Sequence, residues 1–304
     1  MLRPLLREES EHWGEELLWD FGEVASAVET GLDRRALFGS GVREHGMFVA
    51  YCYYLVDAGR AIVGSVYAAQ AHRGRGLETP LLDAVIADAQ ARQGHDRVEC
   101  QTLFSTTPEV DSRFARAGFA GQRRHYLVRS LGPLPLPEAE GSYRLRAVRR
   151  DDLPAVSALI HKSHVGSMDA ALNLTYASPA LCRGFVDTLV LRSGCGRFSA
   201  EASMLAETDQ GIVGLILASE LSSTNGHICQ VSVDPAWESR GLGTLLLVSA
   251  LEAMRRHGLR TASLSVTVGN ARAYTLYNRL GFRLRKEFAA HAWVRPPARI
   301  ELPA

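Results

Sequence analysis

The sequence predicts an α/β protein built from two copies of one unit. A strand-like run rich in β-branched residues, 227–233, is followed by a glycine loop at 238–244 and then by an amphipathic helix. A similar order of strand, glycine loop and helix surrounds residues 70–78. Between the two copies, residues 131–141 contain alternating prolines, which favour an extended and semi-rigid connector.

The spacing of glycines supports the repeat. Gly76, in the first loop, lies 42 residues before Gly118, and Gly241, in the second loop, lies 40 residues before Gly281. A repeat that covers about half of the chain indicates two domains of one fold. We expect these domains at residues 1–130 and 142–304 of the 304 residues, with the proline-rich linker 131–141 between them.

The loop from Glu238 to Thr244 suits a phosphate group. Backbone N–H groups of a glycine loop can point inward, and the dipole of the following helix adds partial positive charge at the same point. Arg240 can add a charge-assisted contact. A dinucleotide fingerprint would need a third glycine where Leu246 stands, and a P-loop would need Gly-Lys-Ser/Thr, which the loop lacks.

Two motifs resemble those of the GNAT acetyltransferase superfamily. The first, Arg240-Gly241-Leu242-Gly243, is similar to the family's pyrophosphate loop, Gln/Arg-x-x-Gly-x-Gly/Ala, although Glu238 occupies the first position. Alone, it would fit a coenzyme A site or an ordinary glycine turn. The second motif, residues 270–282, fills every position of Asn-x-x-Ala-x-x-Leu-Tyr-x-x-x-Gly-Phe. A capped helix with an aromatic core face would explain this second motif alone, but both motifs in this order indicate an acyltransferase.

The resemblance implies two tandem GNAT-like domains, each a mixed, mostly antiparallel sheet with a splayed parallel strand pair, flanked by helices. In the second copy the splayed strands would be 227–233 and 262–268, with the pantetheine arm of acetyl-CoA in the gap. No metal is implied. The cofactor-binding residues that the resemblance implies are Val231, Ser232, Val233, Glu238, Ser239, Arg240, Gly241, Leu242, Gly243, Thr244, Asn270, Ala273 and Tyr277.

The implied reaction is direct transfer of an acetyl or short acyl group to an amine. By resemblance, Tyr277 protonates the leaving thiolate, whereas a packed aromatic ring is its structural alternative. The base that deprotonates the amine is His227, Glu220 or a water chain; an unperturbed imidazole titrates near neutrality, which suits this role. A non-catalytic acyl-CoA-binding or regulatory protein is the alternative function, and Glu238 is the feature that favours it.

The first copy departs further from the motifs. Glu78 occupies the place of the second glycine in its loop, where a carboxylate would repel a pyrophosphate, and residues 108–119 lack the Asn and Leu-Tyr positions. This copy is either a degenerate domain kept for packing and substrate shape, which we favour, or an active domain with altered chemistry. The second copy holds extra residues at 166–202, where the family builds its acceptor-binding loops, so we expect His164, Asp169 and Tyr176 to influence substrate choice.

The remaining elements follow from local patterns. We expect a first strand at 2–6, a helical segment at 9–37, and a helix at 153–162 capped by Asp151 or Asp152. His161 and His164 could suggest a metal pair, but a solvated helix face explains them. The other expected strands are 47–56, 61–68, 125–128, 143–148, 204–207 and 212–221, and a further helix is expected at 179–191.

Composition limits the partners. The net charge is +1 and the pI about 7.8, without a basic block, so we expect no nucleic-acid binding. The five cysteines form no Cys-x-x-Cys pair, which predicts neither a disulfide framework nor a zinc site. No signal peptide or membrane-spanning run is evident, so we expect a cytoplasmic protein. Its expected partners are acyl-CoA and a small-molecule or peptide amine, and it could form a homodimer.

Overall fold

The computed structural model describes residues 2–57, 59–192 and 194–296, which form two compact units. One unit contains residues 2–13, 21–123 and 287–296, and the other contains residues 14–20 and 124–286. Each unit therefore takes its main body from one half of the chain and a shorter segment from the other half. As a domain boundary, the proline-rich segment 131–141 stays a prediction; it has no regular secondary structure apart from bends at its end.

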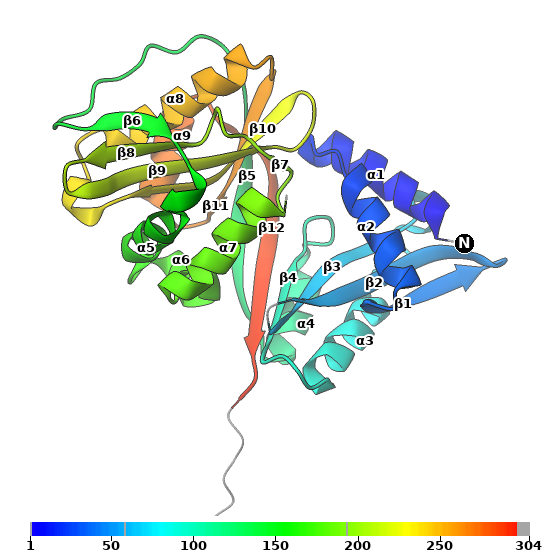
Figure 1. Cartoon of the computed structure of the whole chain (residues 1–304). Coiled ribbons are helices and arrows are strands. Elements are labelled where there is room, and N and C mark those ends of the chain that lie inside the picture. The colour runs from blue at the N-terminus through cyan, green and yellow to red at the C-terminus, as the bar shows by residue number, and fades with distance from the viewer. Residues whose placement is uncertain (1, 58, 193, 297–304) are drawn as a thin grey trace, which may run out of the picture. The chain divides into compact units, whose positions relative to one another are not determined.

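The first unit is a sheet with helices on both faces (Figure 1). Its strands run in the order β1-β2-β3-β4-β12. The helices are α1 (Arg3–Leu17), α2 (Gly22–Asp33), α3 (Glu78–Ala91) and α4 (Pro108–Arg116), with a short 3-10 turn at Gln70–His72. The strands are β1 (Leu37–Glu44), β2 (Met47–Asp57), β3 (Arg60–Ala68), β4 (Arg97–Gln101) and the last part of β12 (Arg283–Val294).

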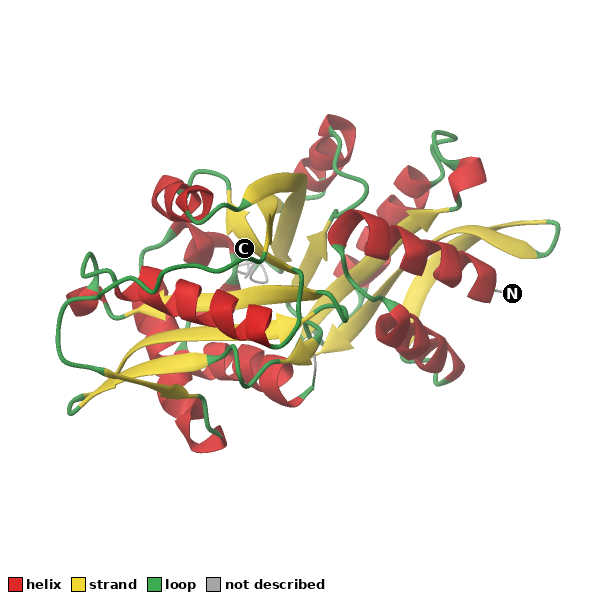
Figure 2. Cartoon of the chain, turned by 90° about the horizontal axis from the view of Figure 1, so that it is seen from above, coloured by secondary structure: helices red, strands yellow, loops and turns green. Residues whose placement is uncertain are grey.

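The second unit repeats this arrangement, with its helices again on both faces of the strands (Figure 2). Its strands run in the order β5-β11-β10-β9-β8-β6, and β7 pairs with β9. The strands are β5 (Ala120–Ser130), β6 (Arg144–Ala147), β7 (Arg197–Phe198), β8 (Met204–Thr208), β9 (Gly211–Glu220), β10 (Asn225–Val233) and β11 (Thr261–Thr267). The helices are α5 (Leu153–His164), α6 (Met168–Leu172), α7 (Pro179–Leu191), α8 (Leu242–Arg256) and α9 (Ala271–Arg279), with 3-10 turns at Arg150–Asp152, Leu174–Tyr176 and Pro235–Trp237.

Strands β10 and β11 form the predicted splayed pair. Their parallel register runs from Asn225–Thr261 to Ile228–Leu264 and stops there, although both strands continue. The register of β10 with β9 shifts between Ile228 and Gln230, so that Cys229 is the extra residue of a β-bulge. The bulge turns the outer end of β10 away from β11 and opens a gap between the two strands.

Two hydrophobic cores cover opposite faces of the second sheet. Along β9, Ile216 and Ala218 pack against α8, whereas Leu215 and Leu217 pack in the core that α5 and α7 share. This alternation follows the two-residue period of a strand. It holds α8, and therefore the loop before it, firmly on the face where the gap opens.

The first unit also has a core on each face, and one of them encloses an acid. Glu9 of α1 is fully buried, and its carboxylate accepts hydrogen bonds from the Trp13 indole at 3.2 Å and from the hydroxyls of Tyr51 and Ser65. Burial raises the pKa of Glu9 to about 7. These hydrogen bonds therefore stabilise the charged carboxylate less than its loss of hydration destabilises it.

Most of the predicted elements are confirmed, and three expectations are wrong. The predicted strand 2–6 is the beginning of helix α1, and the helical segment 9–37 is divided into α1 and α2 with β1 at its end. Asp152 stands at the N-cap position of α5, but its side chain makes no cap hydrogen bond to the helix. Instead, Asp152 accepts hydrogen bonds from the backbone N–H of Arg149 and from the Arg146 guanidinium, at 2.7 Å each. The competing cation explains why the side chain turns away from the helix.

Among the described residues, every helix is too short or too polar to cross a lipid bilayer.

Candidate functional site

A cavity of about 890 Å³ occupies the gap between β10 and β11. Its walls include residues of both strands beyond the point where their pairing stops, from Gln230 to Val233 and from Ser265 to Thr267. The loop before α8 and the first turns of α8 and α9 close its other sides. The cavity therefore lies where the sequence motifs predict the acyl-CoA site.

The loop before α8 has the conformation that an anion site requires. Gly241, the N-cap of α8, has φ +82°, and Ser239 has φ +64°; side chains rarely adopt this left-handed region. The first helical hydrogen bond joins Leu245 N–H to the Gly241 carbonyl at 3.0 Å. The N–H groups of the residues before Leu245 consequently have no helical partner and are available to an anion.

Space around the loop is also restricted. A Cβ atom at Gly241 would lie 3.0 Å from the carbonyl oxygen of Glu138, in the proline-rich segment, and the same segment donates the Glu140 N–H to the Arg240 carbonyl at 2.9 Å. At Gly243 an added Cβ would lie 3.6 Å from Val233. The proline-rich segment thus supports the loop from outside and contributes to its shape.

Glu238, the departure from the family's loop motif, is paired in the structure. Its carboxylate forms an ion pair with the guanidinium of Arg272, in the first turn of α9. Both residues line the cavity, and their side chains are 41% and 68% exposed, respectively. The arginine therefore offsets the negative charge that distinguishes this loop.

The structure brings together nearly all of the predicted cofactor-binding residues. Those that line the cavity are Val231, Ser232, Val233, Glu238, Ser239, Gly241, Leu242, Gly243, Thr244, Asn270, Ala273 and Tyr277. Arg240 lies outside the lining, with its guanidinium carbon 5.0 Å from the centre of the Trp237 ring. Asn270 caps α9 as expected, because its side-chain oxygen accepts the Ala273 N–H at 3.1 Å.

Tyr277 both packs as an aromatic ring and lines the cavity. Its ring packs edge-on against Phe282, with ring centres 6.0 Å apart, and the residue also lines the cavity. Burial raises the pKa of the phenol to about 12, so the hydroxyl carries its proton at neutral pH. None of the described residues forms a hydrogen bond with this hydroxyl in the structure, which leaves its proton available to a ligand.

The two predicted bases lie outside the cavity lining. His227 is buried at the inner end of β10, and its Nδ1 lies 2.9 Å from Ser263 Oγ. The expectation that its imidazole titrates near neutrality is wrong, because burial and the nearby Arg124 charge lower its pKa to about 4. Glu220, at the end of β9, pairs with Arg197 and lies 3.6 Å from His257.

The opposite end of the cavity holds the three residues expected to influence substrate choice. His164, Asp169 and Tyr176 all line it. The imidazole of His164 stacks on the Tyr176 ring, with ring centres 3.9 Å apart and planes 10° apart. The carboxylate of Asp169 accepts a hydrogen bond from Thr267.

His164 and its neighbour His161 are half-buried, and this corrects the expectation of a solvated helix face. His161 Nδ1 donates to the Tyr176 carbonyl at 2.8 Å. His164 Nδ1 lies 2.8 Å from the Ile160 carbonyl, which can only accept. The lone pair of His164 is therefore on Nε2, and burial lowers the pKa of the imidazole.

Sequence reasoning missed several residues of the cavity, among them two polar ones, Gln230 and Arg124. Gln230 receives the Tyr176 hydroxyl at 3.2 Å on its Oε1, and its Nε2 donates to Ser232 Oγ at 3.0 Å. No motif marks a glutamine within a strand. Arg124 also lines the cavity, although it precedes the proline-rich segment and comes from β5. A residue supplied from the other half of the chain has no local signal.

Comparisons with known proteins agree with this geometry. The sequence model described as "Acetyltransferase (GNAT) family" matches residues 1–119 and 182–282. The mycothiol acetyltransferase of Gordonia bronchialis is 27% identical over 240 residues, which cover 73% of this chain and 76% of that protein. The mycothiol acetyltransferase of Acidimicrobium ferrooxidans is 37% identical over 117 residues, but this match spans only 38% of that protein.

A solved structure shows the same fold. It is a tandem GNAT protein from the clavulanic acid biosynthesis pathway, 18% identical, with a TM-score of 0.60 over 86% of this chain and 85% of that chain. The family match covers both halves of the sequence, and each half forms the body of one unit with a parallel strand pair. The chain therefore belongs to the acetyltransferase (GNAT) family, as a tandem-domain N-acetyltransferase.

Proposed function

We propose that the second unit transfers an acetyl group, or a short acyl group, from acetyl-CoA directly to an amine in a ternary complex. The observation that carries the proposal is the single cavity described above, which joins an anion-binding loop at one end to a polar pocket at the other. The loop before α8 would hold the pyrophosphate with its N–H groups. The pantetheine arm would lie along β10, beside Val231 and Val233.

Two side chains in the cavity would transfer protons, one as the general base and one as the general acid. We assign the base to His164 in place of His227 and Glu220, because its Nε2 carries the lone pair and the residue lines the cavity. The neutral amine would then attack the thioester carbonyl, and the tetrahedral intermediate would expel the thiolate of coenzyme A. Tyr277 would supply the proton that the thiolate takes up.

The acceptor end suits a polar, positively charged amine. Asp169 offers a carboxylate, and Tyr176 and Gln230 offer hydrogen-bonding groups in the same pocket. The relatives named mycothiol acetyltransferase make an amine precursor of mycothiol the first acceptor to test. A peptide amine is the second class in the panel.

The first unit would not bind acetyl-CoA. The basic residues of its loop already have partners: Arg75 and His72 both pair with Glu44, at 2.8 and 3.0 Å. Arg73 donates to the Tyr67 hydroxyl at 3.0 Å. Together with Glu78, these contacts engage the basic side chains of the loop within the protein, which favours a degenerate domain.

The decisive experiment measures release of free coenzyme A from acetyl-CoA by the full chain across a panel of amines. Acceptor-dependent release, with mass spectrometry showing an acetyl group on the amine nitrogen, is expected. A protein that binds acetyl-CoA in calorimetry but releases no thiol with any amine would support the non-catalytic alternative.

A further inference from the structure

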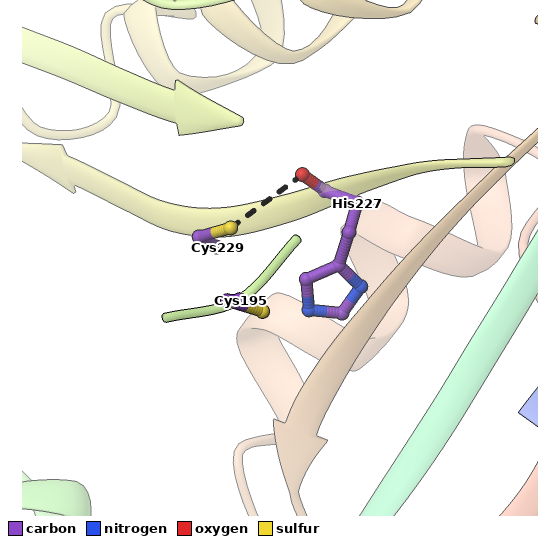
Figure 3. Close-up of side chains that lie close together, drawn as sticks. All are labelled: Cys195, His227 and Cys229. Carbon is purple, nitrogen blue, oxygen red and sulfur yellow. Dashed lines mark hydrogen bonds between the residues drawn. The ribbon is translucent and has the colours of Figure 1, made fainter. Parts of the chain in front are cut away.

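A cluster of two thiols and one imidazole lies beside the acyl-CoA cavity. The ligand atoms of Cys195, His227 and Cys229 all lie within 4.8 Å of one another (Figure 3). His227 and Cys229 come from β10, and Cys195 comes from the segment between α7 and β7. The mechanism proposed above uses none of the three.

The local backbone is shaped to present Cys195. Glycines flank it on both sides, and neither position has room for a side chain. A Cβ at Gly194 would lie 2.4 Å from Thr188 Cγ2, and one at Gly196, whose φ is +72°, would lie 2.4 Å from the Glu220 carbonyl oxygen. These close approaches hold the turn against α7 and against the end of β9, and they fix the position of the thiol.

Cys229 is placed by the β-bulge that also opens the cavity. As the extra residue of the bulge, it has no partner in the register between β9 and β10. Its thiol donates to Ser219 Oγ at 3.4 Å and approaches the His227 carbonyl oxygen at 3.7 Å. The bulge thereby keeps the Cys229 side chain near that of His227, two residues earlier.

The hydrogen bonds around Ser263 determine the tautomer of His227. Ser263 Oγ donates its proton to the Gly226 carbonyl at 3.1 Å. It can then only accept at its other contacts: it receives the Asn225 Nδ2–H at 3.1 Å, and His227 Nδ1 carries a proton and donates to it at 2.9 Å. The remaining nitrogen, Nε2, has a lone pair and lies on the side of the ring that faces the thiols (Figure 3).

We propose that Cys195, His227 and Cys229 bind a soft divalent cation, Zn²⁺ in the first place. Thiolate sulfur and imidazole nitrogen are the ligands that zinc prefers, and an oxygen that accepts the second ring N–H is the usual support of a zinc-bound histidine. The site was not predicted from the sequence, because Cys195 is far from the other two and no Cys-x-x-Cys pair marks it.

The geometry requires only a small adjustment. When the zinc–ligand distances are about 2.0–2.3 Å, the ligand atoms of a tetrahedral site lie roughly 3.6–3.8 Å from one another. Because the three atoms already lie within 4.8 Å of one another, they would approach by about 1 Å at most. A water would supply the fourth ligand, since Cys229 also lines the cavity.

Charge and protons also balance. Binding replaces the two thiol protons, so that two R–SH groups and Zn²⁺ give a bis-thiolate complex and two released H⁺. The complex has no net charge, and the cationic Arg124 near His227 does not repel it. A Cys195–Cys229 disulfide is the competing outcome, but it would leave the lone pair of His227 without a group to bind.

The test uses the full chain, stripped with a chelator and titrated with Co²⁺ under reducing, oxygen-free conditions. Thiolate-to-cobalt charge-transfer absorption and the visible bands of a tetrahedral site should appear and saturate at one equivalent, and Zn²⁺ should displace them. Cys195→Ser should weaken binding by more than about 100-fold. Ser263→Ala, which removes the acceptor of the His227 ring N–H together with the contacts of Ser263 to Asn225 and Gly226, should weaken it by roughly 10–100-fold.

A matched control and an independent measurement keep the test decisive. Cys182→Ser changes a buried thiol outside the cluster, which donates to the Thr175 carbonyl, and should leave the cobalt spectrum unchanged. In the wild-type chain, Zn²⁺ should protect Cys195 and Cys229, which are partly exposed, from alkylation. Absence of charge-transfer bands, an unchanged spectrum in Cys195→Ser, or a Cys195–Cys229 disulfide in place of metal binding would each overturn the proposal.

Discussion

Replacing Glu238 with glutamine should strengthen acetyl-CoA binding. The substitution restores one of the residues usual in the family's loop and removes a negative charge from the wall of the cavity that would face the pyrophosphate. It also releases Arg272 from its ion pair, so that the guanidinium can interact with the ligand. Both effects should strengthen the binding of acetyl-CoA.

Exposure sets the magnitude. Because the two side chains are 41% and 68% exposed, their charges act through a medium close to water. One pair of unit charges at roughly 8 Å then interacts by about 0.5 kcal/mol, and the two charges of a pyrophosphate double this to about 1 kcal/mol. The dissociation constant of Glu238→Gln should therefore be about 2–5-fold lower than that of the wild type.

Calorimetric titration at low and high salt provides the measurement. The gain should disappear in high salt, where screening shortens the reach of exposed charges. Arg272→Gln should weaken binding in both backgrounds, because it removes a cation from the cavity wall; in the wild type it also leaves the Glu238 carboxylate unpaired. Unchanged or weaker binding by Glu238→Gln at low salt would refute the assignment of this loop to the pyrophosphate.

Four further outcomes are expected. Tyr277→Phe should keep acetyl-CoA affinity within a few-fold while turnover falls by roughly 10²-fold, and wild-type turnover would remove the acid role. The acid limb of the pH profile of kcat/KM should lie below pH 6.5 and vanish in His164→Gln; a retained limb would exclude this base. Calorimetry should show one equivalent of acetyl-CoA per chain and at least about tenfold weaker binding in Gly241→Asp, whereas two equivalents would give the first unit a site. Because burial raises the pKa of Glu9 from 4.5 to about 7, the stability that its protonated form contributes should be complete below pH 4.5 and lost as the pH rises through 7; thermal unfolding of Glu9→Gln should lack this dependence, which is worth about 3 kcal/mol.

The sequence predicted the fold and the cofactor end of the site because their signals are local. The glycine loop, the helix that it begins and the Asn270 cap each depend on residues within a few positions of one another. The same locality explains the wrong first strand: the short apolar run at 2–6 suggests a strand, but Leu5 and Leu6 pack within helix α1. Short runs cannot distinguish a strand from a helix face.

What the sequence did not predict depends on contacts between distant segments. Burial and the charge of Arg124 together lower the pKa of His227, and neither effect is visible from the residues next to His227 in the sequence. The partner of Glu238 lies 34 residues away, on another helix. The turn that brings Cys195 to β10 depends on the close approach of two glycines to other elements, which only the fold reveals.

The composition of the two units has a consequence for how the chain is made. The sheet of the first unit is completed by β12, whose residues 290–294 pair with β4 at 97–101. A ribosome synthesises β12 nearly 200 residues after β4, so one edge of β4 stays uncovered during that time. The second unit needs β5, which is made before the rest of its sheet and pairs with β11. The nascent chain can therefore finish the second unit first, and truncation from the C-terminus would damage the unit that begins at the N-terminus.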